Sequence, residues 1–390
     1  MVRLGLGIRP RLRGATQWVR RQPAVARDAA ALRRPDGAGV AYLGFAGQRN
    51  IGDDAILDAH ERWTVGARVR QLPVHHVPEV LRRSGPPARA LPVLVGGGTL
   101  IGRDDWLRRV QDYQGAGWAS TWAVLGAGVE DPEFSGRHVH ASWDGLRRWA
   151  EVLPGLFGDV TVRGPLSQAT LREVGLESRV VGDPALLFAE APRPGAPVEE
   201  DVVAISVAVP EDVWGGRPQD AVDALAGAAR RLVREGRRVR LVALHPADVA
   251  PSRVVARAVE RPGAVEVRTP ATTVELLDDL RGCGAVVGQR LHAVVLASAV
   301  SVPSLAIEYR PKCLDFQRSI GRGDWTVSTR GITADAVVER TLELLADRAG
   351  HSAHVHAGVA PLVEALHEDV RRVRARLGTT AGPELPAVTR

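Results

Sequence analysis

Short apolar runs alternate with amphipathic segments along the chain, and this alternation limits the possible folds more than any other feature. The apolar runs span residues 39–47, 91–98, 121–128, 160–164, 202–209, 239–244, 265–269, 285–288 and 303–309. Segments with a helical apolar face lie between many of them, at residues 52–63, 165–176, 219–236, 273–283 and 290–300. Strands that alternate with helices are typical of α/β layers built on a parallel sheet. The sequence therefore predicts an α/β protein.

The length of the chain and one proline-rich stretch divide this pattern into two domains. A chain of 390 residues is too long for one ordinary hydrophobic core. Residues 189–201, "AEAPRPGAPVEED", have the composition of a linker. We expect two Rossmann-like, doubly wound domains that face each other across a cleft. The expected parts are a basic N-terminal arm at 1–37, an N-terminal domain at 38–190, a C-terminal domain at 200–330 and a helical tail at 331–390.

The net charge of +6 is concentrated at the N-terminus. Residues 1–34 contain nine arginines and a single acid, Asp28, so this arm carries +8 and the remaining chain sums to about −2. Two interpretations are open: a solvated, partly disordered arm, or an arm that docks on an anionic membrane surface. Nucleic-acid binding is not expected, because no basic stripe with interleaved aromatic residues follows.

Several classes of protein are excluded by what the sequence lacks. No apolar run reaches the roughly 18 residues that a membrane-spanning helix needs. The first residues have positive charge but no continuous apolar segment, so they do not predict a secretory signal. Cys283 and Cys313 give neither a disulfide framework nor a paired metal spacing. We expect a cytoplasmic protein, at most peripheral at the inner face of a membrane, without a bound metal.

Unusual residues gather where strands are expected to end, which is where open α/β sheets bind ligands. The loop "GFAGQRNIGDD", residues 44–54, joins the first strand to the first helix, and Asn50 lies within it. Free amides at a helix start favour a polar or anionic ligand. For Asp53 and Asp54, helix capping is one interpretation. A catalytic or acceptor-hydroxyl role is the other interpretation for Asp53.

Glycines end two further strands of the first half. Gly97 and Gly98 belong to "GGGT", residues 96–99, and Gly128 closes "GAG", residues 126–128. Either motif alone is compatible with a tight turn. Two such motifs in one domain favour a cleft floor, where the backbone comes close to a ligand.

Arg163 ends an otherwise apolar strand, "VTVRG", and a buried arginine needs an anionic partner. That partner is either a ligand or a structural acid such as Asp183 in "GDPA". The sequence leaves both options open.

The strongest anion-binding pattern is "GQRLHAVVLASAVSVP", where a helix starts directly after a buried strand. Arg290 and His292 fall in its first turn, next to unpaired N–H groups and a partial positive charge. The arginine fork suits the two oxygens of a phosphate or carboxylate. Satisfied core polar residues are the alternative. Glu308 and Lys312 follow at the next strand end, with Lys312 either an anion ligand or a surface residue.

Taken in order, these motifs resemble the polysaccharide pyruvyl transferase family. The resemblance covers roughly residues 40–320 and consists of "GQRNIGDDAIL", "LVGGGTL", "VLGAGV", "VRGPLSQATLREVGL", "VGDPALL" and "GQRLHAVVLASAVSVPSLAIEYRPKCLDF". It implies two Rossmann-like domains in an arrangement similar to that of GT-B glycosyltransferases. It also implies transfer of pyruvate from phosphoenolpyruvate, a co-substrate and not a bound cofactor, onto a sugar as a ketal.

The resemblance also implies roles for individual residues. The family's donor-binding "RLH" element matches Arg290, Leu291 and His292, and Arg163 matches an earlier donor-binding arginine. From their placement, we further expect His292 to be an acid or a phosphate ligand and Asp53 to orient or deprotonate the acceptor hydroxyl. Lys312 joins the expected donor site in the C-terminal domain. The expected acceptor-side or cleft residues are Asn50, Asp54, Gly97, Gly98, Gly128 and Glu308.

Two positions depart from the family pattern. Arg49 precedes Asn50 where the family usually has a glycine, and Gly164-Pro165 follow Arg163 where an acid is usual.

Two rival functions remain open at this point. One is a GT-B-like glycosyltransferase that uses a nucleotide sugar, and the other is a non-catalytic binding protein on the same fold. The acceptor is equally open among a cell-wall polymer, an exopolysaccharide, a lipid-linked saccharide and a small natural product.

Overall fold

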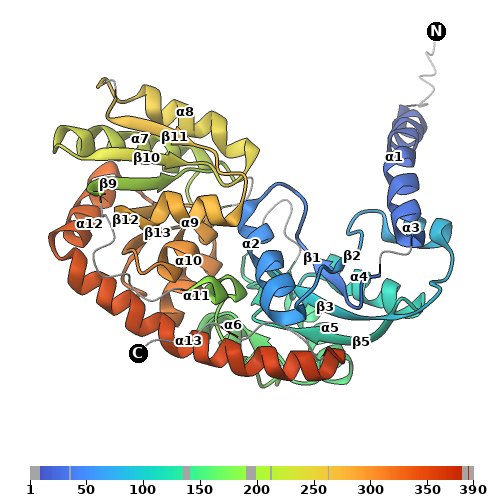
Figure 1. The fold of residues 1–390 in the computed structure, drawn as a ribbon. Coiled ribbons are helices and arrows are strands. Elements are labelled where there is room, and N and C mark those ends of the chain that lie inside the picture. The colour runs from blue at the N-terminus through green and yellow to red at the C-terminus, as the bar shows by residue number, and fades with distance from the viewer. Residues whose placement is uncertain are drawn as a thin grey trace, which may run out of the picture.

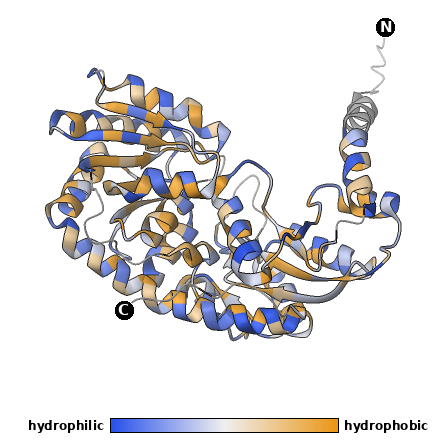
Figure 2. Cartoon of the chain, in the orientation of Figure 1, coloured by the Kyte–Doolittle hydropathy of each residue, from blue (hydrophilic) through white to orange (hydrophobic). Residues whose placement is uncertain are grey.

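Two parallel sheets with helices on their faces make up most of the molecule, as the α/β prediction requires (Figure 1). The structure is a computed structural model that describes residues 9–34, 37–134, 141–189, 199–210, 213–261, 263–379 and 385. Figure 2 shows that hydrophobic residues fill the strands, while hydrophilic residues gather on the outer faces of the helices. No helix among the described residues is long and apolar enough to span a membrane.

The N-terminal sheet has four main strands in the order β2-β1-β3-β5, all parallel. These strands are β1 (Ala41–Gly44), β2 (Arg70–Gln71), β3 (Leu91–Gly96) and β5 (Ala119–Val124). Two short parallel pairs lie beyond β5, formed by β4 (Thr99–Ile101) with β6 (Gly128–Val129) and by β7 (Thr161–Val162) with β8 (Arg179–Val180). The helical elements are α2 (Ile51–Ala59), the π-helix η1 (His60–Val65), α3 (Val77–Ser84), α4 (Asp104–Gly115), α5 (Trp143–Phe157), α6 (Pro165–Arg172) and the 3-10 helix η2 (Pro184–Phe188).

The C-terminal sheet has six parallel strands in the order β11-β10-β9-β12-β13-β14. In order of appearance this is 3-2-1-4-5-6, the arrangement of dinucleotide-binding Rossmann domains. The strands are β9 (Glu199–Ser206), β10 (Arg238–Val242), β11 (Val265–Arg268), β12 (Cys283–Gly288), β13 (Ser304–Glu308) and β14 (Thr326–Ser328). The helical elements are α7 (Pro218–Arg234), η3 (Pro246–Asp248), α8 (Val249–Arg257), α9 (Thr273–Arg281), α10 (Leu291–Ala299), α11 (Pro311–Ser319) and α12 (Ala334–Ala346).

The last helix, α13 (Arg348–Leu377), runs under both sheets (Figure 1). Its C-terminal half contacts the N-terminal domain: Thr161 Oγ1 and Arg179 Nη2 donate to Asp369 at 2.7 and 2.9 Å. Arg376 Nε donates to the Trp122 carbonyl at 2.5 Å. The helix is therefore a brace between the domains, and it lies within the expected helical tail at 331–390.

Part of the N-terminal arm forms a helix whose end packs on the N-terminal domain, where one interpretation had been a solvated, partly disordered segment. Helix α1 (Arg9–Arg33) buries Val25, Ala29 and Leu32, and these residues join the same apolar cluster as Val77 of α3. The spacing i, i+4, i+7 places these three side chains on one helix face, and burial of that face explains the order. Residues 1–8, 35 and 36 lie outside the described residues, so the expected membrane contact of the arm stays a prediction.

A buried carboxylate joins the domains beside the expected site. Asp315 on α11 accepts hydrogen bonds from the Leu166 N–H (2.8 Å), the Ser167 N–H (3.3 Å) and Ser167 Oγ (2.6 Å) at the start of α6. A Cβ on Gly164 would lie 2.2 Å from Asp315 Oδ1. Glycine therefore follows Arg163 in this chain because a carboxylate from the other domain occupies that space.

Replacing Asp315 with Ala should destabilise the protein, because it removes the acceptor for three donors at an otherwise uncapped helix start. We expect the Tm to fall by about 2 °C to 3 °C, since charge-assisted bonds of this kind contribute roughly 2 kcal/mol in all and a chain of 390 residues has a large entropy of unfolding. Asp278→Ala is the matched control, because Asp278 is exposed and pairs with its helix neighbour Arg281. Equal Tm values for the two variants in differential scanning calorimetry would contradict this assignment.

His60, at the start of η1, is a buried neutral histidine. Its Nδ1 lies 3.1 Å from Thr64 Oγ1, and its side chain is fully enclosed under β1 and β3. Burial lowers the pKa of His60 from its ordinary 6.5 to about 3, against a weaker opposing effect of Asp183. The unfolded chain therefore binds a proton below pH 6.5 that the folded protein does not bind.

The free energy of unfolding should decrease as the pH is lowered, because of His60. Between pH 6.5 and 3 its contribution decreases by about 1.4 kcal/mol for each pH unit. We expect the Tm of the wild type to fall more steeply than that of His60→Asn as the pH is lowered over this range, because the titrating carboxyl groups are the same in both proteins. Parallel curves of Tm against pH would show that His60 is not the responsible group.

Candidate active site between the two domains

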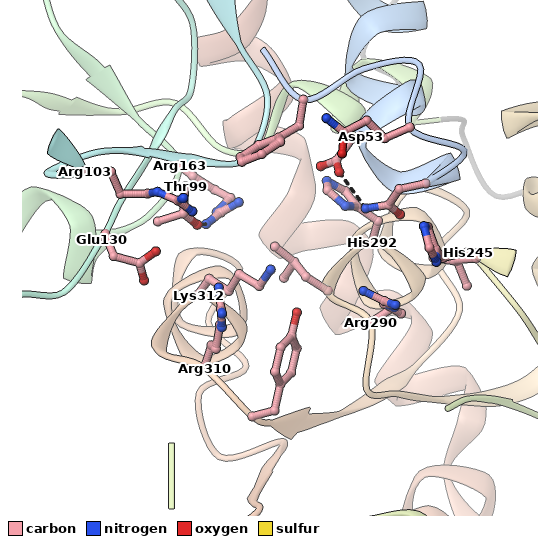
Figure 3. A pocket seen from close by; sticks show the side chains of 17 residues that line it. Asp53, Thr99, Arg103, Glu130, Arg163, His245, Arg290, His292, Arg310 and Lys312 are labelled. Atoms are coloured by element: carbon pink, nitrogen blue, oxygen red, sulfur yellow. Dashed lines mark hydrogen bonds between the residues drawn. The ribbon is translucent and has the colours of Figure 1, made fainter. Parts of the chain in front are cut away.

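The strand order reverses once in each sheet, between β1 and β3 and between β9 and β12, and ligands bind at such reversals. The loops that leave these strands face each other. The Ile51 N–H, the first of α2, donates to the Leu244 carbonyl of the C-terminal domain at 3.0 Å. Beside this contact lies a cavity of about 290 Å³, lined by residues of both domains (Figure 3).

The cavity brings together most of the residues expected from the sequence. Those that line it are Asn50, Asp53, Gly98, Arg163, Arg290, Leu291, His292 and Lys312. They come from five separate loops, which approach one another only in the folded chain.

Four expected residues do not line the cavity. Asp54 accepts a hydrogen bond from the Gly47 N–H at 3.0 Å and lines a neighbouring pocket, so it stabilises the loop. Glu308 is half-buried and lies outside the cavity. It is the last residue of β13, and the next residue, Tyr309, is the first one after this strand to line the cavity. Gly97 and Gly128 lie behind the wall. A Cβ on Gly128 would lie 2.5 Å from Arg163 Nη2, so this glycine makes room for the guanidinium.

The structure shows the structural partner of Arg163, and its contact with a ligand stays a prediction. Its side chain is 1% exposed, with Nη1 3.4 Å from Asp183 Oδ2 and Nη2 3.3 Å from Thr99 Oγ1. The structural ion pair with Asp183 is therefore present. The guanidinium also forms part of the cavity wall, where it faces any bound ligand.

His292 lies against the same carboxylate. Its Nε2 is 3.6 Å from Asp183 Oδ2, an electrostatic contact slightly too long for a hydrogen bond. Burial alone would raise the pKa of Asp183, but His292, Arg163 and the Ala185 N–H outweigh burial and hold it at about 2. The ring also packs against α2, since a Cβ on Gly52 would lie 2.3 Å from His292 Nδ1. A permanent anion and close packing thus orient the imidazole.

Arg290 has a structural partner that sequence reasoning missed. Its Nε and Nη2 donate to Asp248 at 3.0 and 2.6 Å, and the Asp248 side chain is 1% exposed. The pairing fixes the guanidinium at the cavity wall. Asp248 lies at the end of η3, and no local pattern links it to Arg290.

Two neighbouring helices begin at the cavity in the same way. Arg290 is the N-cap residue of α10 and Arg310 that of α11, and neither N-cap side chain caps its helix. Two residues further on, each helix places a basic side chain in the cavity, His292 in α10 and Lys312 in α11. Lys312 Nζ lies 5.2 Å from the centre of the Tyr309 ring. The positive ends of two helices and their basic residues therefore meet in one place.

Two carboxyl groups line the cavity as well. Burial raises the pKa of Asp53, while His292, Lys312 and a 2.6 Å hydrogen bond from Asn50 Nδ2 oppose this shift. Burial likewise raises the pKa of Glu130, which is 3% exposed, against the effect of Arg310 and Lys312. Both groups are therefore closer to their neutral form than ordinary surface carboxyls.

Sequence reasoning missed Glu130, Arg103, Arg310 and His245, which also line the cavity. Each follows a strand or short connecting loop, so a search of every strand end would have found them. Among the described residues, no group of three or more His, Cys, Asp or Glu side chains is placed to hold a metal ion.

Solved structures show the same fold at low sequence identity. S. aureus MnaA, solved with UDP, is 12% identical with a TM-score of 0.56, over 89% of this chain and all of that chain. A UDP-glucosyltransferase from Polygonum tinctorium, solved with 3,4-dichloroaniline, is 11% identical with a TM-score of 0.51, over 88% of this chain and 99% of that one. These neighbours confirm the expected GT-B-like arrangement, and at this identity they show the fold alone.

Sequence comparison identifies the family. Among curated proteins, none matches this chain. The family model described as polysaccharide pyruvyl transferase matches residues 50–311, about two thirds of the sequence. The match includes all the residues that line the cavity except Phe45, Gln48 and Lys312. The chain belongs to the polysaccharide pyruvyl transferase family.

Proposed function

We propose that this protein transfers the pyruvate group of phosphoenolpyruvate onto two hydroxyls of a sugar, glycan or lipid-linked saccharide as a ketal. The observation that carries the proposal is the meeting of two uncapped helix N-termini, at Arg290 and Arg310, in one small cavity. Phosphoenolpyruvate has two anionic groups, a phosphate and a carboxylate. Two neighbouring helix starts, each with an arginine, offer one anion-binding position for each group.

The charges around the cavity favour such a donor. Five cationic side chains line it: Arg103, Arg163, Arg290, Arg310 and Lys312. Three of these arginines form ion pairs with buried or half-buried acids that do not line the cavity, which hold the guanidinium groups in place. The pairs are Arg103 with Asp105, Arg163 with Asp183 and Arg290 with Asp248. The two carboxyls inside the cavity have raised pKa values and therefore cancel less of the positive potential. A preorganised site of this kind stabilises a phosphate that leaves with its bonding electrons.

The residues divide the reaction between the two domains. Arg290, His292 and the start of α10 are proposed to hold the phosphate, with His292 as its ligand or as an acid. Asp53, held by Asn50, lies on α2 of the N-terminal domain and is proposed to orient and deprotonate the attacking hydroxyl. This places the acceptor on the N-terminal side of the cavity.

The direct test incubates the purified protein with phosphoenolpyruvate and a panel of glycosides. We expect release of phosphate and a product whose mass exceeds that of the glycoside by pyruvate less water. A thermal-shift comparison of phosphoenolpyruvate with uridine and guanosine diphosphates separates the rival glycosyltransferase function. Stabilisation by a nucleotide alone, without phosphate release, would overturn the proposal.

Lys312→Gln should weaken donor binding, because it removes a cation from the start of α11. The KM for phosphoenolpyruvate should rise about 10-fold to 100-fold, the usual loss for one charge-assisted contact. Arg318→Gln is the control, since Arg318 is exposed at the other end of the same helix and outside the cavity. An unchanged KM for Lys312→Gln would remove this lysine from the donor site.

Asp53→Asn should slow turnover while leaving donor binding nearly unchanged. Loss of the base should lower kcat by about 10²-fold to 10⁴-fold, with the phosphoenolpyruvate Kd measured separately by calorimetry. Asp54→Asn is a close control, because the adjacent carboxylate bonds to Gly47 and does not line the cavity. Similar acceptor saturation curves and kcat values for both variants would exclude the role given to Asp53.

A further inference from the structure

Glu130 is a buried carboxyl for which the described residues provide no ion pair within 4 Å. It directly follows β6, and its N–H donates to the Ile101 carbonyl at 2.8 Å, which fixes its backbone. Its Oε2 is buried and has no hydrogen-bond partner among the described residues. Core packing does not explain such a group, because a buried carboxyl oxygen without a hydrogen-bond donor destabilises the folded protein. A ligand in the cavity is the natural partner.

The surroundings of Glu130 are cationic but do not neutralise it. Arg103, Arg163, Arg310 and Lys312 all act on it from around the cavity, yet burial outweighs them and raises its pKa. A bound doubly anionic donor would raise this pKa further, because like charges disfavour ionisation. Donor binding would thus favour the protonated form of the Glu130 carboxyl, which can transfer a proton.

Glu130 and His292 lie on different sides of the cavity. Figure 3 shows Glu130 next to Arg103 and near Lys312 and Arg310, whereas His292 lies beside Asp53. A donor whose phosphate is held near His292 and Arg290 would extend its three-carbon part toward Lys312 and Glu130. The role inferred for Glu130 rests on the proposed function. In that reaction the ketal can form only if the methylene carbon of the donor receives a proton.

We propose that Glu130 is the acid that protonates the methylene carbon of phosphoenolpyruvate. The O–H bond of Glu130 breaks, and the electron pair of the carbon–carbon double bond forms the new C–H bond. The first sugar hydroxyl attacks the adjacent carbon and gives its proton to Asp53. Phosphate leaves with the electron pair of its C–O bond and takes up the proton held by Asp53. The second hydroxyl then attacks the same carbon and returns a proton to Glu130, which restores the enzyme.

The test compares Glu130→Gln, which keeps the shape but cannot donate an acidic proton, with the wild type. We expect kcat to fall at least about 100-fold, while thermal shift shows a phosphoenolpyruvate Kd within about threefold of the wild-type value. Glu308→Gln is the matched control: Glu308 is also a carboxyl with a pKa raised by burial, but it lies outside the cavity.

The pH profile distinguishes an acid from a merely structural side chain. For the wild type, kcat should fall as pH rises and Glu130 ionises in the donor complex. This alkaline decrease should be absent from the residual activity of Glu130→Gln and present again in Glu130→Asp. Wild-type kcat in Glu130→Gln, or an unchanged alkaline decrease in its residual activity, would overturn the inference while leaving the proposed function intact. If the wild type released no phosphate from phosphoenolpyruvate with any glycoside, the proposed function itself would fail, and the role of Glu130 with it.

Discussion

Buried carboxylates behind the cavity wall make its cationic surface possible. A guanidinium that is withdrawn from water requires an anionic partner, and its desolvation is costly without one. Asp183 is the anionic partner of Arg163 and His292, and Asp248 is that of Arg290. These acids do not line the cavity themselves, so the basic groups that they hold form part of its wall. Under the proposed function, an anionic donor would be bound by groups that need little rearrangement.

The same cavity depends on how firmly the two domains are held. Asp315 of the C-terminal domain caps α6, immediately after Arg163, and the Ile51 N–H bonds to the Leu244 carbonyl on the opposite side. Helix α13 adds a third connection through Asp369. The distance between the basic groups on α10 and α11 and the Asp53 carboxyl on α2 is therefore set by contacts between domains. Such bracing favours a site that is largely formed before the substrates bind.

The two departures from the family pattern have different physical explanations. Arg49 takes the left-handed conformation, with a φ of 63°, that the usual glycine adopts readily. The turn before α2 is thus retained at a cost of about 1 kcal/mol, and the exposed side chain lies at the neighbouring pocket. Gly164, in contrast, has no room for a side chain, because the Asp315 carboxylate of another helix occupies that space. One departure keeps the backbone geometry, and the other fits a contact between the two domains.

The sequence by itself determined the features that depend on local spacing. The alternation of apolar runs and amphipathic segments predicted both sheets, and the first turn of α10 predicted Arg290 and His292 at a strand end. The tertiary structure alone decided which groups meet and how deeply they are buried. Asp248 behind Arg290, Glu130 inside the cavity and Glu308 outside it all follow from the packing of segments far apart in the chain. The ordered part of α1 likewise depended on a partner, α3, that offers an apolar surface. Burial and charge pairing arise between distant elements, and no local pattern of residues contains that information.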